Sequence, residues 1–143
     1  MILKDVLTAK GHRVVTVSAK SSVADAIRAM HAEKVGAVMV PDAEGCPVGI
    51  FTERDVVRLH ADGDRDFDQI PVGTRMTCSV VLGRLSMEVD EALGLMTQHR
   101  FRHLPVVEQG EIRGIVSIGD LVKYRMERIE AEADAMRAYI QSA

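Results

Sequence analysis

The stretch Gly49-Ile50-Phe51-Thr52-Glu53-Arg54-Asp55 decides the fold, because it recurs as Gly114-Ile115-Val116-Ser117-Ile118-Gly119-Asp120. The match continues upstream, where the segment from Val23 to Met30 resembles the segment from Val89 to Met96 in its order of apolar and polar residues. One residue is gained or lost between the two blocks. The chain is therefore a tandem duplication of a unit of about 60 residues.

Each unit is predicted to contain a strand, a helix, two strands and a second helix. The first strands are the β-branched runs 13–17 and 78–82. The first helices are 22–33, which opens with the capping pattern Ser22-Val23-Ala24-Asp25, and 89–98. The remaining strands are 35–40 and 48–52 around a turn at 41–45, and 104–107 and 112–117 around a turn at 108–110. The second helices are 53–60 and 118 onward.

The predicted organisation has four segments. Residues 1–60 form the first repeat, 61–70 a linker, 71–124 the second repeat and 125–143 a helical extension. The linker is acidic and rich in turn-forming residues, so we expect it to be solvated.

The extension carries apolar residues at alternating spacings of four and three, which is typical of a heptad seam. The seam consists of Val122, Met126, Ile129, Ala133, Met136 and Ile140. It can cap the domain, form a short dimer contact or pack on its own chain, and the pattern alone leaves these alternatives open.

Composition limits the function classes. The 143 residues include 18 Lys+Arg and 21 Asp+Glu, a net charge of −3, which argues against nucleic acid as a partner. No apolar run approaches the ~20 residues that a membrane span needs. Cys46 and Cys78 form no CxxC motif, and the start of the chain lacks the features of a secretory signal. We therefore expect free thiols and a cytoplasmic protein.

Neither a metal site nor a catalytic group stands out. Histidines at positions 12, 31, 60 and 99 have no metal-ligand spacing. No serine, histidine and aspartate arrangement is recognisable, so we expect a protein that is not an enzyme.

The segment Arg102-His103-Leu104-Pro105-Val106-Val107, followed by Gly114-Ile115-Val116-Ser117-x-x-Asp120, resembles a cystathionine β-synthase (CBS) domain. With the preceding helix and the run Val14–Val17, the whole chain except its last helix is similar to a tandem CBS pair, or Bateman module. Two motif copies at the right spacing make the resemblance specific. The variant Thr52-Glu53-Arg54-Asp55 and the tail are similar to CBS-pair proteins with no attached enzyme.

The resemblance implies an α/β fold, an α+β sandwich of two β-α-β-β-α repeats packed about a pseudo-twofold axis, plus the C-terminal helix. It also implies two clefts between the repeats, which in many relatives hold AMP, ADP, ATP, NAD(H) or S-adenosylmethionine. Two such pairs often form a homodimer.

Thr52 and Ser117 each end a strand and begin a helix, with Asp55 and Asp120 three residues later. A helix start presents unpaired N–H groups that suit phosphate, and a carboxylate one turn later can accept both hydroxyls of a ribose. The same pattern is also a capping box, in which the acid only bonds the helix start. Both interpretations remain open, and both can hold in turn.

The other candidate ligand contacts follow from the same framework. Adenine would lie near Thr16, Ala37 and Val38 or their equivalents in the second repeat, where Pro105 also lies. Arg54, Arg102 and His103 are the candidate cations for phosphate, with solvated surface side chains as the alternative. Gly119 stands where the first repeat has Arg54, so the clefts are not equivalent and one good site is expected rather than two.

The sequence thus favours a non-catalytic regulatory module that binds an adenine nucleotide and senses energy or redox state. The alternative is a dimeric interaction module that regulates a partner enzyme and whose clefts are vestigial. An enzyme ranks below both, because the barrel of the enzymes that carry related regulatory segments needs ~250 residues.

Overall fold

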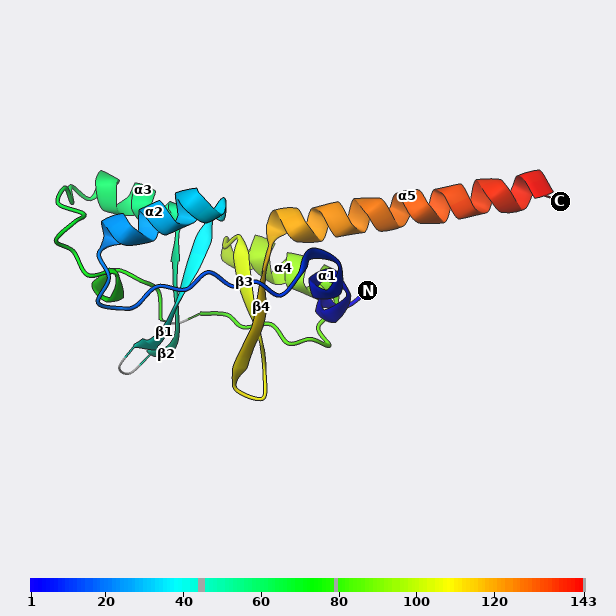
Figure 1. Cartoon of the computed structure of the whole chain (residues 1–143). Helices are drawn as coiled ribbons and strands as arrows, with labels where there is room; N and C mark the ends of the chain where they lie inside the picture. Colours follow the sequence, from blue (N-terminus) through cyan, green and yellow to red (C-terminus); the bar gives the residue numbers. More distant parts are fainter. Residues whose placement is uncertain (44–45, 79, 143) are drawn as a thin grey trace. The chain divides into compact units, whose positions relative to one another are not determined.

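The computed structural model describes residues 1–43, 46–78 and 80–142, which form helices and two pairs of short strands (Figure 1). The elements in chain order are α1 (Leu3–Lys10), α2 (Val23–Glu33), β1 (Ala37–Ala43), β2 (Cys46–Thr52), α3 (Glu53–Ala61), the 3-10 turn η1 (Val72–Thr74), α4 (Val89–His99), β3 (His103–Glu108), β4 (Glu111–Ser117) and α5 (Ile118–Ser142). The mixed helix and strand fold predicted from the sequence is confirmed.

The chain folds into two compact units that do not coincide with two consecutive halves. One is continuous, Val14–Val80, and is called the continuous unit here. The other joins Met1–Arg13 to Val81–Ala143 and is called the split unit. The N-terminal segment, which the sequence analysis left without an element, is thus part of the second repeat's core.

The core of the continuous unit lies between α2, α3 and the β1–β2 sheet. Ser22 accepts a hydrogen bond from the backbone N–H of Asp25 at 3.0 Å, which fixes the start of α2 as its capping pattern predicts. From there the helical period places Val23 and Met30 on the buried face. The buried residues of this core are Val23, Ala26, Met30, Val38, Val40, Phe51, Leu59 and Val72.

The core of the split unit depends on α1 as much as on the repeat itself. Leu3, Val6 and Leu7 are 0–1% exposed and pack among residues of α4, β3, β4 and α5. The backbone N–H of Leu3 donates to the carbonyl of Met87 at 2.8 Å, which ties α1 to the segment before α4. The other buried residues are Met87, Val89, Ala92, Met96, Leu104, Val106, Val116 and Leu121.

Each unit contains a two-stranded antiparallel sheet, and the two registers match. Ala37 lies opposite Thr52 in the β1–β2 pair, and His103 lies opposite Ser117 in the β3–β4 pair. The turn between β3 and β4 is made by Gln109 and Gly110, both with positive φ. The turn predicted at 41–45 includes residues 44 and 45, which lie outside the described residues.

The prediction of regular strands at 13–17 and 78–82 is wrong for the residues that the structure describes. Thr16 forms a single parallel bridge with Met39, and Gly83, just beyond the second predicted strand, forms one with Val106. The first contact consists of two backbone hydrogen bonds, from Val17 to Met39 and from Met39 to Val15, both 2.9 Å long. Val15 and Val17 are β-branched, and their side chains pack against the core although this segment forms no longer run of strand hydrogen bonds.

Two equivalent glycines show why the repeated motif begins as it does. A Cβ on Gly114 would lie 2.6 Å from Cδ2 of Leu7, and one on Gly49 would lie 2.5 Å from Sδ of Met76. Leu7 lies in the leading segment of the first repeat, and Met76 lies in the leading segment of the second. Each glycine therefore makes room for the segment that leads into the other repeat.

The cysteine prediction is wrong for Cys78, which is in a disulfide bond. An antiparallel bridge between Ile50 and Thr77 brings this part of the chain against β2, a proximity that sequence separation does not reveal. The side chain of Cys46 lies outside the described part of the chain. The thiols therefore give no argument for a reducing compartment.

The predicted linker, 61–70, contributes to the continuous unit. Phe67 and Ile70 are half-buried and pack against its core, and the backbone N–H of Ala24 donates to the carbonyl of Phe67 at 3.0 Å. The other described residues of this segment are exposed, apart from Asp64, which is half-buried.

Among the described residues, no helix combines the length and the apolar character that crossing a membrane requires.

Candidate functional site

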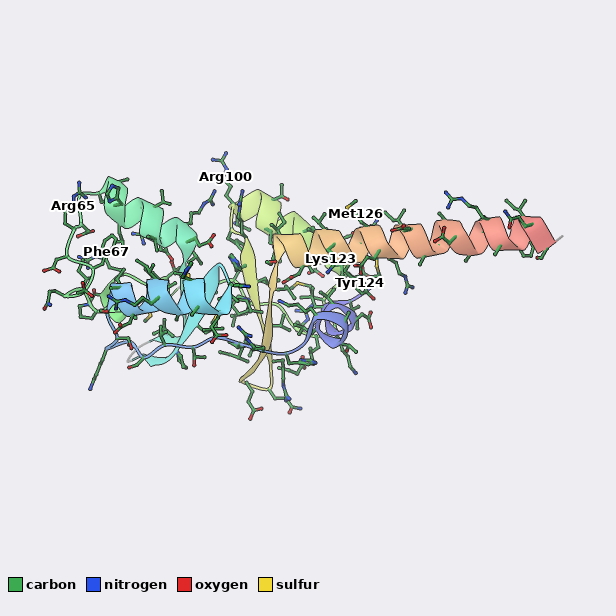
Figure 2. All side chains as sticks on the ribbon, turned by 45° about the horizontal axis from the view of Figure 1, so that its top comes forward. Arg65, Phe67, Arg100, Lys123, Tyr124 and Met126 are labelled. Carbon is green, nitrogen blue, oxygen red and sulfur yellow. The ribbon has the colours of Figure 1, made fainter. Side chains whose placement is uncertain are left out.

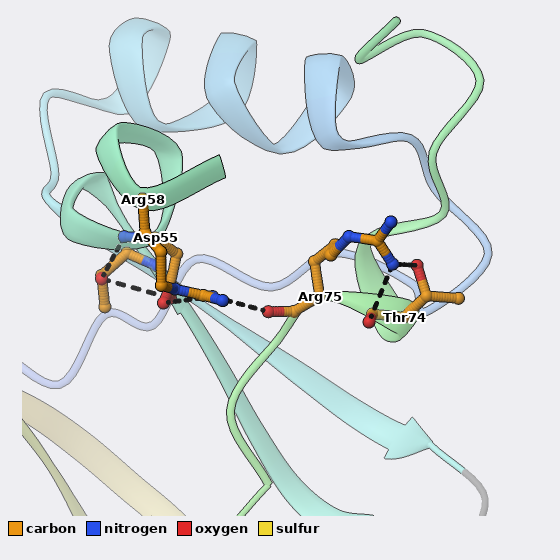
Figure 3. A network of polar contacts seen from close by, with 5 residues as sticks. Asp55, Arg58, Thr74 and Arg75 are labelled. Carbon is orange, nitrogen blue, oxygen red and sulfur yellow. Dashed lines mark hydrogen bonds and ion pairs between the residues drawn. The ribbon is translucent and has the colours of Figure 1, made fainter. Parts of the chain in front are cut away.

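In the continuous unit, the junction between β2 and α3 holds the first hydroxyl and carboxylate pair. The backbone N–H of Thr52 donates to Oδ2 of Asp55 at 2.9 Å, and the backbone N–H of Asp55 donates to the Thr52 hydroxyl at 3.3 Å. The two residues thus form a reciprocal capping box at the start of α3. Figure 3 shows Asp55 together with Arg58 and Arg75.

Arg58 occupies the second carboxylate oxygen of Asp55. Its Nη2 lies 3.1 Å from Oδ1 of Asp55 and also donates to the carbonyl of Arg75 at 3.2 Å (Figure 3). The Asp55 side chain is only 13% exposed, whereas that of Arg58 is 49% exposed. Arg58 therefore neutralises a half-buried carboxylate, while about half of its own side chain remains exposed to solvent or to an anion.

In the split unit, the junction between β4 and α5 repeats the cap. The backbone N–H of Ser117 donates to Oδ2 of Asp120 at 2.8 Å, and the backbone N–H of Asp120 donates to the Ser117 hydroxyl at 3.0 Å. The capping hydrogen bonds are thus present at both junctions.

The cation beside Asp120 comes from α1 instead of from its own helix. The Lys10 ammonium lies 2.6 Å from Oδ2 of Asp120 and donates to the carbonyl of Ile115 at 2.8 Å. Both side chains of the ion pair are about one-third exposed. The N-terminal helix is therefore fastened by its last residue to the candidate site of the second repeat.

The ion pair affects the acidity of Asp120. Partial burial is the largest single influence and by itself would raise the pKa of this carboxyl group. The hydrogen bond from Lys10, the N–H of Ser117 and the positive charge of Lys10 together outweigh burial and lower the pKa of Asp120. Asp120 is consequently held as a carboxylate.

Three predicted adenine contacts of the continuous unit lie at different depths. Ala37 is buried directly opposite Thr52, so it lies beside the junction. Val38 is fully buried and its side chain belongs to the core, which leaves only its backbone for contact with a ligand. Thr16 is exposed on the extended segment that borders β1.

The predicted residues of the split unit gather around Ser117. His103, which is half-buried, faces Ser117 across the sheet, and the carbonyl of Arg102 accepts a hydrogen bond from the backbone N–H of Ile118 at 2.9 Å. Arg102 is exposed. Pro105 is buried within β3, two residues further along the strand.

Arg54 is the second residue of α3 and is exposed next to Asp55. Within each unit the structure thus brings the predicted hydroxyl, the carboxylate and at least one predicted cation to one strand-to-helix junction.

Two cations at these junctions were not predicted. Arg58 follows Asp55 by three residues on the same helix, so the spacing of paired charges was a signal that could have found it. Lys10 meets Asp120 across most of the chain, and no local pattern links them.

The described residues contain no cluster of three or more His, Cys, Asp or Glu side chains that could hold a metal ion.

Comparison with known proteins gives a consistent result over nearly the whole chain. The family model of the CBS domain matches twice, at residues 3–62 and 69–127. The CBS domain-containing protein YhcV of Bacillus subtilis (strain 168) is 37% identical over 130 residues, which cover 90% of this chain and 89% of that protein.

Solved structures agree with the sequence comparisons. A CBS-domain containing protein from Agrobacterium tumefaciens has 45% sequence identity and a TM-score of 0.82, and the match covers 87% of this chain and 99% of that one. A CBS domain protein from Pyrobaculum aerophilum, complexed with AMP, has a TM-score of 0.72 at 24% identity, with 84% and 89% of the two chains covered. The duplicated motif, the paired junctions and these matches lead to one conclusion: the chain belongs to the CBS domain family, as a tandem CBS pair.

Proposed function

We propose that this CBS pair is a non-catalytic regulatory module that binds an adenine nucleotide and senses energy or redox state. The observation that carries the proposal is the duplicated junction, where a hydroxyl and a carboxylate lie at a helix start beside a cation. The AMP complex of the Pyrobaculum protein supports it at the level of the fold alone.

In this proposal the ribose takes the place of the capping bonds. A carboxylate with two acceptor oxygens can bind two neighbouring hydroxyls once it leaves the backbone N–H, and a helix start can then offer that N–H to phosphate. Arg54 and Arg58 would meet phosphate in the continuous unit, and Arg102 and His103 in the split unit. Adenine would lie near the exposed Thr16 and beside the buried Ala37.

The two junctions are expected to differ in affinity. Asp55 is paired with an arginine of its own helix, whereas Asp120 is paired with Lys10, which also anchors α1. Freeing Asp120 for a ribose would loosen the attachment of α1 to the split unit, and freeing Asp55 would not. We therefore expect the stronger site at Thr52 and Asp55.

A thermal-shift screen over AMP, ADP, ATP, NAD+, NADH and S-adenosylmethionine tests the proposal first. A ligand at ~100 times its Kd adds about 2.7 kcal/mol to the free energy of unfolding, so a true ligand raises the melting temperature by several degrees. If none of the six raises it, nucleotide sensing is rejected.

Calorimetric titration of the best ligand then tests the junction. Asp55→Ala should weaken binding about 10- to 100-fold, because it removes charge-assisted hydrogen bonds to the ribose. Asp25→Ala is the matched control, since Asp25 holds the same position after the cap of α2 but lies outside the proposed site. Equal affinity of the Asp55→Ala variant and the parent would contradict the proposed site.

A second candidate function is an interaction module that regulates a partner enzyme. The observation that favours it is the row of exposed apolar side chains on α5, at Val122, Met126, Ile129, Met136 and Ile140. Truncation after Tyr124 separates the two functions. An unchanged nucleotide affinity with loss of a partner would favour the interaction module, and the reverse would favour the sensor.

A further inference from the structure

Most of α5 is exposed, as judged from the residues that the structure describes. The first two turns are anchored, since Leu121 is fully buried, Tyr124 packs against the core, and Nη1 of Arg125 lies 2.6 Å from Oδ1 of Asp90. From Met126 to Ser142 every described residue is exposed except Ala133, which is half-buried. In both Figure 1 and Figure 2 this stretch extends past the other elements of the split unit.

The exposed stretch is nevertheless apolar along one stripe. Met126 is 64% exposed, Ile129 55%, Met136 60% and Ile140 65%. These residues belong to the heptad seam, in which Val122, Ile129 and Met136 hold d positions and Met126, Ala133 and Ile140 hold a positions. A helix with such a stripe gains most of its stability from packing the stripe against something else.

The charges beside the seam indicate what that partner is. With the seam as a and d, Arg125 and Glu132 hold g positions, and Glu130 and Arg137 hold e positions. In a parallel, in-register pair of helices, each g residue faces the e residue five positions later on the other helix. Arg125 then faces Glu130, and Glu132 faces Arg137, so both kinds of contact join opposite charges. The helix is complementary to itself.

We propose that α5 pairs with α5 of a second copy of this chain as a short, parallel, in-register coiled coil. The exposed seam, the anchored first turns and the self-complementary charges carry this proposal together. It does not depend on nucleotide binding, so either proposal can fail without the other.

Disulfide trapping tests the contact directly. In a chain with Cys46→Ser and Cys78→Ser, single cysteines are placed at two d positions, Ile129→Cys and Met136→Cys. The controls are Ala131→Cys and Ala138→Cys, which lie on the outer side of the same helix. A disulfide needs Cα atoms roughly 4.4–6.8 Å apart, a distance that equivalent d residues meet only in a parallel pair in register.

We expect both d-position variants to form covalent dimers under mild oxidation, at least tenfold faster than the two controls. Cross-linking at one d position only indicates an antiparallel or shifted pair and overturns the proposal. Equal rates at all four positions, or no covalent dimer at any of them, also overturn it. Far-UV circular dichroism and thermal melting establish that each variant is folded.

A second experiment changes charges beside the seam and keeps Cys46 and Cys78. It therefore does not depend on the two serine substitutions. A chain with Arg137→Glu has two acidic residues at the contact, and a chain with Glu132→Arg has two basic ones. Each homodimer is repulsive, whereas the mixed dimer joins opposite charges in both contacts. Native mass spectrometry of an equimolar mixture, with one chain isotope-labelled, measures the mixed fraction.

The matched control makes the same charge changes on the outer face, with Arg128→Glu in one chain and Glu127→Arg in the other. We expect a mixed dimer in several-fold excess over the homodimers for the contact pair, and a near-statistical distribution for the control pair. Equal distributions in the two mixtures, or no dimer of the parent chain, would contradict the proposal.

Discussion

At the scale of single residues, the two repeats have the same helix cap, but a different cation pairs with its carboxylate in each repeat. Asp55 meets Arg58 of its own helix, whereas Asp120 meets Lys10 from the other end of the chain. The first contact organises a helix start, and the second also closes a compact unit. The two carboxylates are therefore equivalent in sequence and different in their structural role.

The Asp120 ion pair predicts how stability changes with pH. The pKa of Asp120 is lower in the folded chain than its ordinary value of 3.8, so folding is favoured by this group above that value. As pH falls, Asp120 is protonated first in the unfolded chain and only at lower pH in the folded chain. The stabilisation of the folded state by the ion pair is therefore lost as pH falls through the native pKa of Asp120. Asp120→Asn should lower the free energy of unfolding at pH 7 by about 1 kcal/mol, and by much less at pH 3.

Urea unfolding between pH 7 and pH 3 measures this difference. Lys10→Met should reproduce the loss at pH 7, and the double variant should lose little more than either single one, because both remove the same contact. A loss from Asp120→Asn that stays constant with pH would exclude the ion pair as its cause.

The residues of the site were predictable to different degrees. Thr52, Ser117 and their aspartates were found because hydroxyl, carboxylate and helix start stand within four residues in both repeats. Lys10 and the disulfide of Cys78 were not, because each depends on a contact between segments that lie far apart in the sequence.

At the scale of elements, the glycine of the repeated motif allows two segments of the chain to pack closely. Gly49 and Gly114 occupy the same position in β2 and β4, and each lies against a side chain of the segment that leads into the other repeat. The strand would pass that segment at a greater distance if it carried a side chain there. The repeated motif therefore has two structural roles. Its hydroxyl and carboxylate residues cap the following helix, and its glycine allows this close contact.

Gly114→Ala should lower the free energy of unfolding by about 1–3 kcal/mol, because the new methyl group would overlap the fully buried Leu7. Gly94→Ala is the control, since nothing lies within 4 Å of its added Cβ in α4. That substitution should raise the free energy of unfolding by up to ~1 kcal/mol, because alanine favours a helix. Thermal and urea unfolding measure both, and a Gly114→Ala variant as stable as the parent would contradict the packing role.

Helices α2 to α5 and the four strands were predictable because their periodicity, caps and turns are local signals. Predicted and observed bounds of α2, α3 and α4 agree within one or two residues. The first strand of each repeat and α1 were not predictable in the same way. Val15 and Val17 have the composition of a strand, but the number of ladder bonds they make is set by the neighbouring sheet.

At the scale of the whole molecule, the two repeats exchange their leading segments. α1 begins the first repeat and packs on the core of the second, whereas Val72 of η1 lies at the start of the second repeat and packs on the core of the first. A duplication in sequence has thus become two units that each contain parts of both halves.

This exchange predicts which unit each core substitution weakens. Leu7→Ala should cost about 2–5 kcal/mol and raise amide hydrogen exchange in residues 81–121, with protection in 14–80 largely retained. Val72→Ala, also fully buried, should do the reverse. Exchange followed by mass spectrometry assigns the loss to a segment, and a loss for Leu7→Ala confined to its own neighbours in sequence would contradict the exchange.

The split unit has a consequence for the order of events at the ribosome. The continuous unit is complete once Val80 has emerged, and it can fold while translation goes on. Helix α1 is made before the continuous unit, yet Leu104, Val116 and Leu121, which it packs among, are made after that unit. Throughout that interval the nascent chain exposes the apolar face of the α1 segment, so a segment made before the continuous unit docks only after that unit can fold.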